Sequence, residues 1–388
     1  MTIDFDTFID RRHQHNSIKW AMYPEDVLPL WVADMDFRSP EPVLRALHER
    51  VEHGVFGYQS DSPELRAVLV ERMRARHHFN ITSDQLLFLP GLVFGLNAVS
   101  RAVGESGSGV LVQTPVYPPF LTAPKNTHRL LQKAALASSV TNGILRYEID
   151  FDALEAAVTP ETRLFILCNP HNPVGRVYTR PELEGIADFC LRHDLIICAD
   201  EIHCDLVYPG YEHISIATLS PEVAQKCVTL LAPSKTFNLP GFGLGFAVIE
   251  NAELLNAVRT SAGTTGASVN ALAYTAAQAA YSEGQAWLDE LLVYLQGNRD
   301  ALVDFVRENL PNVPVTQPEG TYLSWLDFRA FNLEPDPYTY FLDNARVAFN
   351  GGEHFDTPGF IRVNCGTTRA TLMEALKRVL DALTPNSA

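Results

Sequence analysis

Several segments of this 388-residue chain place a reactive side chain directly after an apolar, strand-like run. In LLAPSKTFNLPG, Ser234 and Lys235 follow the apolar residues and precede a glycine-rich turn. A lysine amine that is withdrawn from water loses its charge more easily, and the neutral amine can form a Schiff base with a carbonyl compound. A lysine after a strand is also commonly a solvated surface residue, so this segment alone leaves both interpretations open.

A second segment, LIICADEIHCD, ends an apolar run in two carboxylates, Asp200 and Glu201. A carboxylate that is buried at the end of a strand needs a positively charged partner to offset its loss of hydration. The protonated nitrogen of a pyridine ring is one such partner, and the carboxylate would keep that ring cationic and able to withdraw electrons. The competing interpretation is a helix N-cap, for which aspartate is well suited.

Two further turns offer groups that bind oxygen atoms of a ligand. The turn CNPHNPVGR packs two Asn-Pro pairs and a glycine after a strand, and the amide of Asn172 is a candidate donor to a ring hydroxylate, although a plain turn has a similar composition. The segment LLFLPGLVFGLNAV passes from a strand through a Pro-Gly turn into a helix. Backbone amides at the start of that helix would suit a phosphate group, and they belong to Gly91, Leu92 and Val93.

These segments are positioned by short apolar runs that alternate with longer helical patterns between about residues 63 and 283. Short β-rich runs separated by helices predict parallel strands with crossover helices, which is an α/β architecture. Open sheets of this kind bind ligands at the carboxyl ends of their strands, where the polar segments stand. The runs are LLFLP, GVLVQTP, RLFILCNP, LIICADEI, CVTLLAPSK and GFAVIE.

Chain length and a change of pattern near residue 285 predict two domains. Residues 51–285 are expected to form a large domain with a mostly parallel sheet between helices. Residues 286–388 are expected to form a smaller α+β domain, in which a long helix precedes the strand-like TYLSWLDF and GFIRVNC and a final helix begins near Arg369. Residues 1–50 are expected to contribute to the small domain and to the substrate entrance.

The composition restricts the partners and the compartment. A net charge of −16 leaves no basic surface for a phosphate backbone, which argues against nucleic acid as a partner. No apolar run approaches the roughly 18 residues of a membrane span, and the polar N-terminus lacks a signal-peptide core, so no membrane partner and a cytoplasmic location are expected. No metal site is expected. The cysteines are expected to be reduced and structural, and they are Cys168, Cys190, Cys198, Cys204, Cys227 and Cys365.

Taken together, the four segments resemble those of fold-type I pyridoxal-phosphate enzymes of aminotransferase class I/II, and the resemblance spans nearly the whole chain. A closer similarity links WVADMDFRSPEPV, FGYQ, NPHNPVGRV and PSKTFNLPG to the MalY/PatB group of cystathionine β-lyases, which are carbon-sulfur lyases of the same fold. The resemblance implies pyridoxal 5′-phosphate as the cofactor. It also implies a homodimer with active sites at the subunit interface.

The resemblance assigns roles around the cofactor ring. Lys235 would bind the cofactor covalently, and Asp200 would face the pyridine nitrogen. Asn172 would contact the ring hydroxyl beside His203, which stands where many aminotransferases have a tyrosine; a fully paired core histidine is the alternative. Tyr117, in TPVYPPF, would stack on the ring, a role that needs only a flat apolar face.

At the phosphate, the resemblance implies contacts from the turn at Gly91, from Ser234 and from Tyr58 of the neighbouring subunit. Ala232 and Gly243 depart from the wider pattern, because many aminotransferases have a serine and an arginine at these positions. Without that arginine, the phosphate would depend on the remaining groups.

The substrate class also comes from the resemblance. It implies cleavage of L-cystathionine and related cysteine S-conjugates to a thiol such as homocysteine, pyruvate and ammonia, and thus a part in methionine metabolism and amino-acid biosynthesis. Arg362, in FIRVNC, would hold the substrate carboxylate as a planar bidentate donor, with a surface ion pair as the alternative. An aminotransferase using the same residues is the competing function. A regulator that uses the fold to bind a transcription factor is a further alternative, against which the lysine, aspartate and arginine argue.

Overall fold

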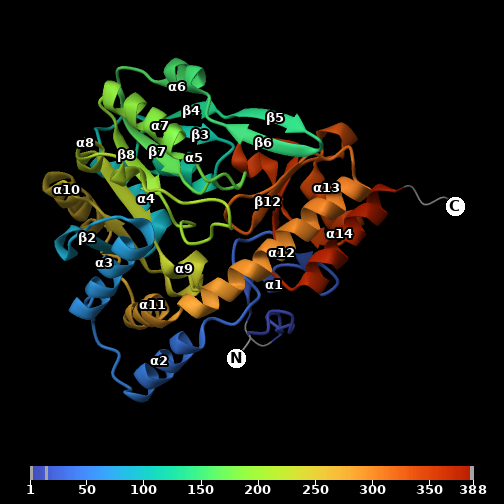
Figure 1. Cartoon of the computed structure of the whole chain (residues 1–388), viewed down its shortest axis with the longest axis horizontal. Coiled ribbons are helices and arrows are strands. Elements are labelled where there is room, and N and C mark those ends of the chain that lie inside the picture. Colours follow the sequence, from blue (N-terminus) through green and yellow to red (C-terminus); the bar gives the residue numbers. More distant parts are fainter. Residues whose placement is uncertain (1–2, 14–15, 385–388) are drawn as a thin grey trace.

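The computed structural model describes residues 3–13 and 16–384, and its largest sheet has seven strands and lies in the left half of Figure 1. All neighbouring strands in this sheet are parallel except β10, which runs antiparallel to both β9 and β2. The mostly parallel sheet predicted from the sequence is therefore confirmed. In spatial order the strands are β2 (Leu86–Leu89), β10 (Gly245–Val248), β9 (Cys227–Leu231), β8 (Ile196–Asp200), β7 (Thr162–Cys168), β3 (Gly109–Thr114) and β4 (Leu130–Ala135).

The central strands are apolar on both faces because helices cover both sides of the sheet. In β7, Leu164 and Ile166 belong to one core, whereas Phe165 and Leu167 belong to the other. One core is closed by α4 (Leu92–Ala102), α5 (Pro118–Asn126) and α10 (Ala252–Gly263). The other is closed by α3 (Pro63–His77), α7 (Arg180–Arg192) and α11 (Ala271–Glu283).

A second sheet of six strands carries the C-terminal part of the chain. Its antiparallel hairpin β5–β6 comes from the middle of the sequence, and β6 joins β11 in parallel. This hairpin lies within the predicted range 51–285, and the division of the chain into domains stays a prediction. In spatial order the strands are β14 (Asn350–Gly351), β15 (Phe360–Asn364), β12 (Leu323–Asp327), β11 (Val315–Thr316), β6 (Ile144–Glu148) and β5 (Ala137–Thr141).

The long helix α12 (Gln285–Asn309) runs from the first sheet's helices to the second sheet, where it packs beside α14 (Arg369–Leu383) (Figure 1). Both helices were predicted from the sequence, and their apolar faces share a core with β12 and β15. The remaining helices are α1 (Ile18–Ala21), α2 (Glu41–Glu52), α6 (Phe151–Ala157), α8 (Pro221–Gln225), α9 (Pro233–Thr236) and α13 (Pro337–Asn344).

Within the N-terminal segment, a buried charge cluster around Asp36 holds the segment's own residues together. The Asp36 carboxylate accepts hydrogen bonds from Lys19 Nζ at 2.9 Å, Arg11 Nη1 at 2.7 Å and Trp20 Nε1 at 2.8 Å. Lys19 is fully buried. The segment continues into β1 (Leu28–Pro29), which pairs in parallel with β13 (Val347–Ala348).

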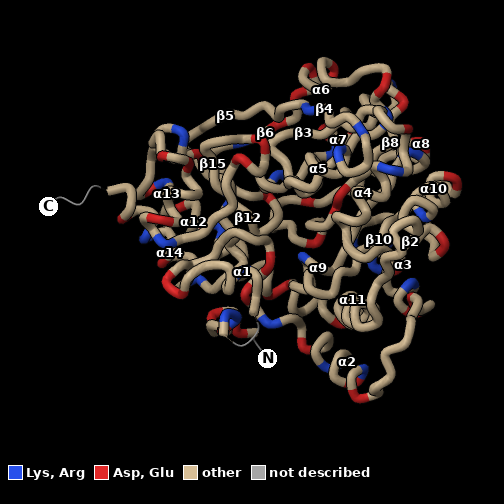
Figure 2. The backbone as a smooth tube through the Cα atoms, turned by 180° about the vertical axis from the view of Figure 1, so that it is seen from behind, with Lys and Arg blue, Asp and Glu red and all other residues tan. Residues whose placement is uncertain are grey.

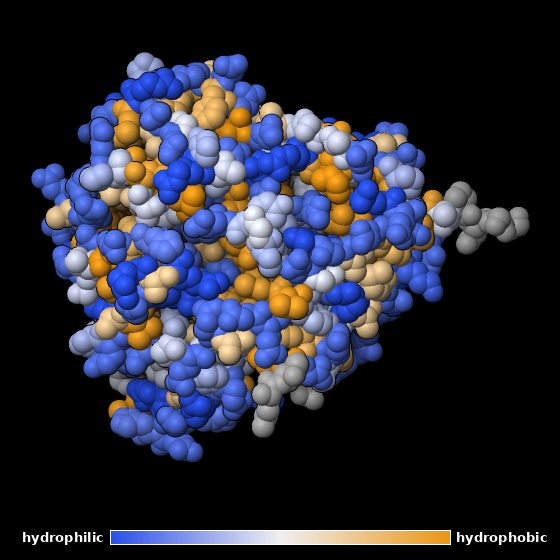
Figure 3. Space-filling model, viewed as in Figure 1, coloured by the Kyte–Doolittle hydropathy of each residue, from blue (hydrophilic) through white to orange (hydrophobic). Residues whose placement is uncertain are grey.

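The surface carries charges of both signs. Acidic and basic residues are dispersed over the view in Figure 2, and the face in Figure 3 alternates hydrophilic residues with small apolar patches. Among the described residues, no helix is long and apolar enough to cross a membrane. All six cysteines are buried and none is in a disulfide, as the sequence predicts.

Replacing Asp36 by asparagine should destabilise the protein strongly, because it removes the nearer carboxylate partner of buried Lys19 and leaves only Asp34, whose Oδ1 lies 3.6 Å from Lys19 Nζ. We expect Asp36→Asn to lower the free energy of unfolding by about 3 kcal/mol, measured by urea denaturation. Asp26→Asn is the matched control, because Asp26 forms an exposed pair with Arg346, and it should change the free energy of unfolding little.

The stability that Asp36 contributes should decrease at low pH. Burial alone would raise the pKa of Asp36, but the charges of Lys19 and Arg11 outweigh burial and lower this pKa below its ordinary value. The stabilisation is therefore complete above the unfolded pKa of about 4 and is lost as the pH falls through the folded pKa. Equal stability of Asp36→Asn and Asp26→Asn at pH 7 would contradict this account.

Candidate active site

A cavity of about 290 Å³ lies at the carboxyl ends of β7, β8 and β9. These strand ends meet at one edge of the sheet because the three strands are parallel neighbours. The cavity brings together nine of the residues predicted from the sequence, and they are Gly91, Leu92, Val93, Tyr117, Asn172, Asp200, His203, Ser234 and Lys235.

Lys235 lies on the short helix α9, directly after β9, and its side chain forms part of the cavity wall. Its Nζ donates a hydrogen bond to the carbonyl oxygen of Ala33, in the N-terminal segment. Burial, reinforced by the nearby positive charge of Arg362, lowers the pKa of Lys235 to about 8. The amine is therefore not simply a solvated surface group, and a useful fraction of it is neutral near physiological pH.

Asp200 ends β8 with its carboxylate buried inside the cavity wall. One oxygen accepts the backbone N–H of Ile202 at 3.1 Å, so the aspartate does cap the following turn. Within the described part of the chain, no cation forms an ion pair with it. Burial consequently raises the pKa of Asp200 to about 7. A cationic ring nitrogen in the cavity would supply the missing partner, so this carboxylate fits the pyridine ring of pyridoxal phosphate.

Two more polar side chains face the same space. His203 is buried, its Nδ1 has no hydrogen-bond partner among the described residues, and burial holds its pKa well below the ordinary value. It is thus not a fully paired core histidine. The Oδ1 atom of Asn172 accepts a hydrogen bond from Arg362 Nη1 at 3.1 Å. The amide donor of Asn172 is then the group that remains for a ligand oxygen, as a ring hydroxyl would require.

Another part of the cavity wall is formed by the start of α4. Gly91 precedes the helix with a φ of 111°, a conformation that favours glycine, and the first-turn amides of Leu92 and Val93 have no partners within the helix. Gly243 also lines the cavity, and Lys235 is the one lysine or arginine among the lining residues. A phosphate here would rely on helix amides and on Ser234.

Arg362 lies at the centre of β15 in the second sheet and is almost fully buried. In addition to its hydrogen bond to Asn172, its guanidinium donates to the carbonyl oxygen of Trp31 at 2.8 Å. The Cζ atom of Arg362 lies 5.0 Å from the ring centroid of Phe355. Burial lowers the pKa of Arg362 to about 10, so it remains a cation. It is therefore a buried arginine beside the cavity and not part of a surface ion pair.

Tyr58 is the one predicted site residue that lies away from this cavity. Its side chain is fully exposed and lines a different surface groove with Phe242 and Asn270. Its predicted role in the other subunit's site stays a prediction.

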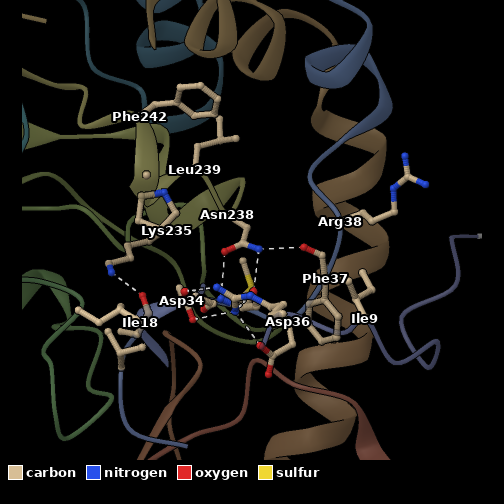
Figure 4. Close-up of a pocket in the computed structure, with 17 residues that line it drawn as sticks. Ile9, Ile18, Asp34, Asp36, Phe37, Arg38, Lys235, Asn238, Leu239 and Phe242 are labelled. Carbon is tan, nitrogen blue, oxygen red and sulfur yellow. Dashed lines mark hydrogen bonds and ion pairs between the residues drawn. The ribbon is translucent and has the colours of Figure 1, made fainter. Parts of the chain in front are cut away.

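A second, larger cavity of about 670 Å³ shares Ala33, Lys235 and Pro240 with the first. Its other walls come from Ile9, Arg11, Ser17 and Ile18 and from residues 32–38 and 238–242 (Figure 4). Sequence reasoning named no individual residue in 9–38 as part of the site. The contact to Lys235 is made by a backbone carbonyl, which no side-chain pattern reveals, although the WVADMDF motif marks the segment.

The sequence matches the family "Aminotransferase class I and II" over residues 25–379. The chain belongs to the class I and II aminotransferase family. Cystathionine β-lyase PatB from Bacillus subtilis is 37% identical, over 96% of this chain and 99% of its own.

Solved structures with similar folds agree with this family assignment. The crystal structure of OvoB superposes with a TM-score of 0.94 at 43% identity, covering 99% of this chain and 100% of that one. The PLP-bound C-S lyase from Staphylococcus hominis superposes with a TM-score of 0.91 at 32% identity, covering 99% of both chains. The α/β, fold-type I architecture predicted from the sequence is thereby confirmed.

If Lys235 is the covalent anchor, Lys235→Ala should lose the visible absorption band that wild type develops when pyridoxal phosphate is added. The reason is that the band requires a bond between the cofactor aldehyde and a lysine amine, and no other lysine of residues 3–13 and 16–384 lines the cavity. Absorbance between 300 and 500 nm would be recorded after gel filtration. The control is Lys226→Ala, because Lys226 pairs with exposed Asp194 on the surface. A normal band in Lys235→Ala would identify another lysine as the anchor.

Proposed function

We propose that this protein is a pyridoxal-phosphate-dependent carbon-sulfur β-lyase that acts on L-cystathionine and related cysteine S-conjugates. The observation that carries the proposal is that a low-pKa lysine and an unpaired buried carboxylate line one cavity, in a chain of lyase-like sequence. For cystathionine, the overall reaction consumes one water and gives homocysteine, pyruvate and ammonia.

The cofactor, when bound, supplies an electron sink that stabilises negative charge at the substrate Cα. Asp200 keeps the ring nitrogen protonated, because its buried carboxylate is the counter-ion of that cation. Arg362 holds the substrate α-carboxylate and thereby orients the Cα–H bond. The amine of Lys235, once free, takes the Cα proton at its Nζ atom, for which a pKa of about 8 is well placed.

The remaining cavity residues hold the cofactor without taking part in bond changes. Asn172 and His203 would contact the ring hydroxyl, and Tyr117 would stack on the ring. Ser234 and the amides of the α4 N-terminus, at Gly91, Leu92 and Val93, would bind the phosphate. These assignments rest on the geometry of the cavity and on the family resemblance.

An aminotransferase is the second candidate, because it would use the same lysine, aspartate and arginine. The two functions differ in whether a thiol leaves or a second substrate accepts the amino group. The relatives named as cystathionine β-lyase and C-S lyase favour thiol release.

Thiol release without a keto acid is therefore the decisive assay. We expect purified holoenzyme to release free thiol and pyruvate in equal amounts from L-cystathionine, measured with a thiol reagent and a coupled dehydrogenase. Asp200→Asn should keep the visible cofactor band but lose about 10²- to 10³-fold in turnover, because the ring nitrogen loses its counter-ion. Thiol release that depends on an added 2-oxo acid, or near-normal turnover of Asp200→Asn, would overturn the proposal.

We further propose a homodimer in which Tyr58 contacts the phosphate bound by the partner subunit. The support is that Tyr58 is a fully exposed aromatic next to exposed Phe56, in a groove that also contains Phe242. Exposed apolar side chains of this kind are typical of surfaces that another chain covers. The cytoplasm stays the predicted compartment.

Mixing two inactive variants tests this assembly. Tyr58→Ala and Lys235→Ala should each be severely impaired, and a mixture that exchanges subunits should recover part of the thiol release, because one hybrid site carries both intact residues. Subunit exchange would be verified separately with tagged chains. Absence of any recovery despite proven exchange would mean that Tyr58 does not complete the partner's site.

A further inference from the structure

The carbonyl oxygen of Ala33 accepts two hydrogen bonds within the active site. One comes from Lys235 Nζ and the other from the hydroxyl of Tyr322 at 2.9 Å. Ala33 lines both cavities, and Figure 4 shows the Lys235 amine turned toward the N-terminal segment beside Asp34. Tyr322 is fully buried, and the roles proposed so far do not use it.

This carbonyl is held firmly in place by its neighbours in the chain. The side-chain amide of Asn364 donates to the carbonyl oxygens of Val32, at 2.6 Å, and Asp34, at 2.7 Å, which flank Ala33. The side chain of Asn238 pairs with both backbone groups of Met35 at 2.9 Å. The Ala33 oxygen therefore presents a fixed acceptor to the cavity.

Tyr322 is fixed just as firmly. Thr321 precedes it with a φ of 69°, which is unfavourable for a β-branched residue and is maintained by a hydrogen bond from its N–H to Leu206 O at 2.7 Å. The Tyr322 carbonyl accepts the N–H of Cys365 at 2.8 Å. At Gly366, an added Cβ would lie only 3.3 Å from the Tyr322 ring. The surrounding structure thus directs the hydroxyl at Ala33.

We propose that the Ala33 carbonyl is the resting site of the Lys235 amine whenever this amine is not bonded to the cofactor, and that Tyr322 is a positioning residue that limits how strongly the site holds the ammonium form. The inference rests on the proposed function of Lys235. A carbonyl oxygen has two lone pairs, and the Tyr322 hydroxyl occupies one of them. Because both donors share one acceptor, the pull of the carbonyl on the ammonium is weaker than it would be alone.

Other charged groups around the amine also act on it. Arg362 on β15 disfavours the ammonium form, whereas Asp34 in the N-terminal segment and Asp200 on β8 favour it. His203 also faces the amine, and it is neutral because burial keeps its pKa low. Tyr322 acts on the protonation of Lys235 without adding a charge to the site, because its hydroxyl weakens the Ala33 carbonyl as a hydrogen-bond acceptor.

The test is the pKa of Lys235 in Tyr322→Phe, measured on protein freed of cofactor. Each variant would be labelled with traces of acetic anhydride across the pH range, and acetylation of Lys235 would be followed by peptide mass spectrometry. We expect the midpoint to shift upward by about half a unit or more, because the freed lone pair strengthens the bond to the ammonium. The pH profile of kcat should shift in the same direction, with KM for cystathionine little changed.

The matched control is Tyr147→Phe, which removes a buried hydroxyl that accepts from Trp325 Nε1 at 3.3 Å in the second sheet. Its labelling midpoint should equal that of wild type. An unchanged or lowered midpoint in folded Tyr322→Phe would overturn the inference.

Incorporation of 4-aminophenylalanine at position 322 covers the case in which Tyr322→Phe does not fold. Its neutral amino group is a weaker donor than the phenol and does not become an anion over the labelling range, so the midpoint of Lys235 should shift upward, and an unchanged or lowered midpoint would overturn the inference. Labelling uses neither substrate nor cofactor, so its outcome is independent of whether the protein is a lyase.

Discussion

An unpaired carboxylate inside a cavity is the constraint on which this site depends. The backbone of Asp200 is fixed by the parallel sheet, because it pairs in register with Cys168 on β7 and with Leu230 on β9. It cannot turn toward water, and the described residues offer it no ion-pair partner. Its burial is therefore costly until a cation enters the cavity. The folded protein therefore favours the binding of a cationic ring beside Asp200.

The two sheets contribute different parts of the same chemistry. The first sheet holds Asp200 and Lys235 at adjacent strand ends, whereas the second sheet holds Arg362 in the middle of β15. Asn172 connects the two sheets at the site, because it lines the cavity and its side-chain oxygen accepts a hydrogen bond from Arg362. The geometry that binds the ring is in this way coupled to the geometry that binds a substrate carboxylate.

Sequence reasoning located the strand ends because buried parallel strands are continuous apolar runs that polar residues interrupt abruptly, as at Asp200 and Lys235. It did not find β5, because all of its residues are exposed and no apolar run marks it. The antiparallel direction of β10 could not be predicted from the sequence either, because the pattern of apolar side chains is the same for parallel and antiparallel buried strands. Ala33 contributes through a backbone carbonyl and Tyr322 through a fold-dependent contact, so neither carries a local sequence signal.

Locating the covalent attachment of the cofactor tests the account most directly. Holoenzyme would be reduced with borohydride, digested, and searched by mass spectrometry for a phosphopyridoxyl group on each of the chain's six lysines. The account predicts the modification on Lys235 alone, since that is the lysine in the cavity with Asp200. Stoichiometric modification of any other lysine, with Lys235 unmodified, would contradict it.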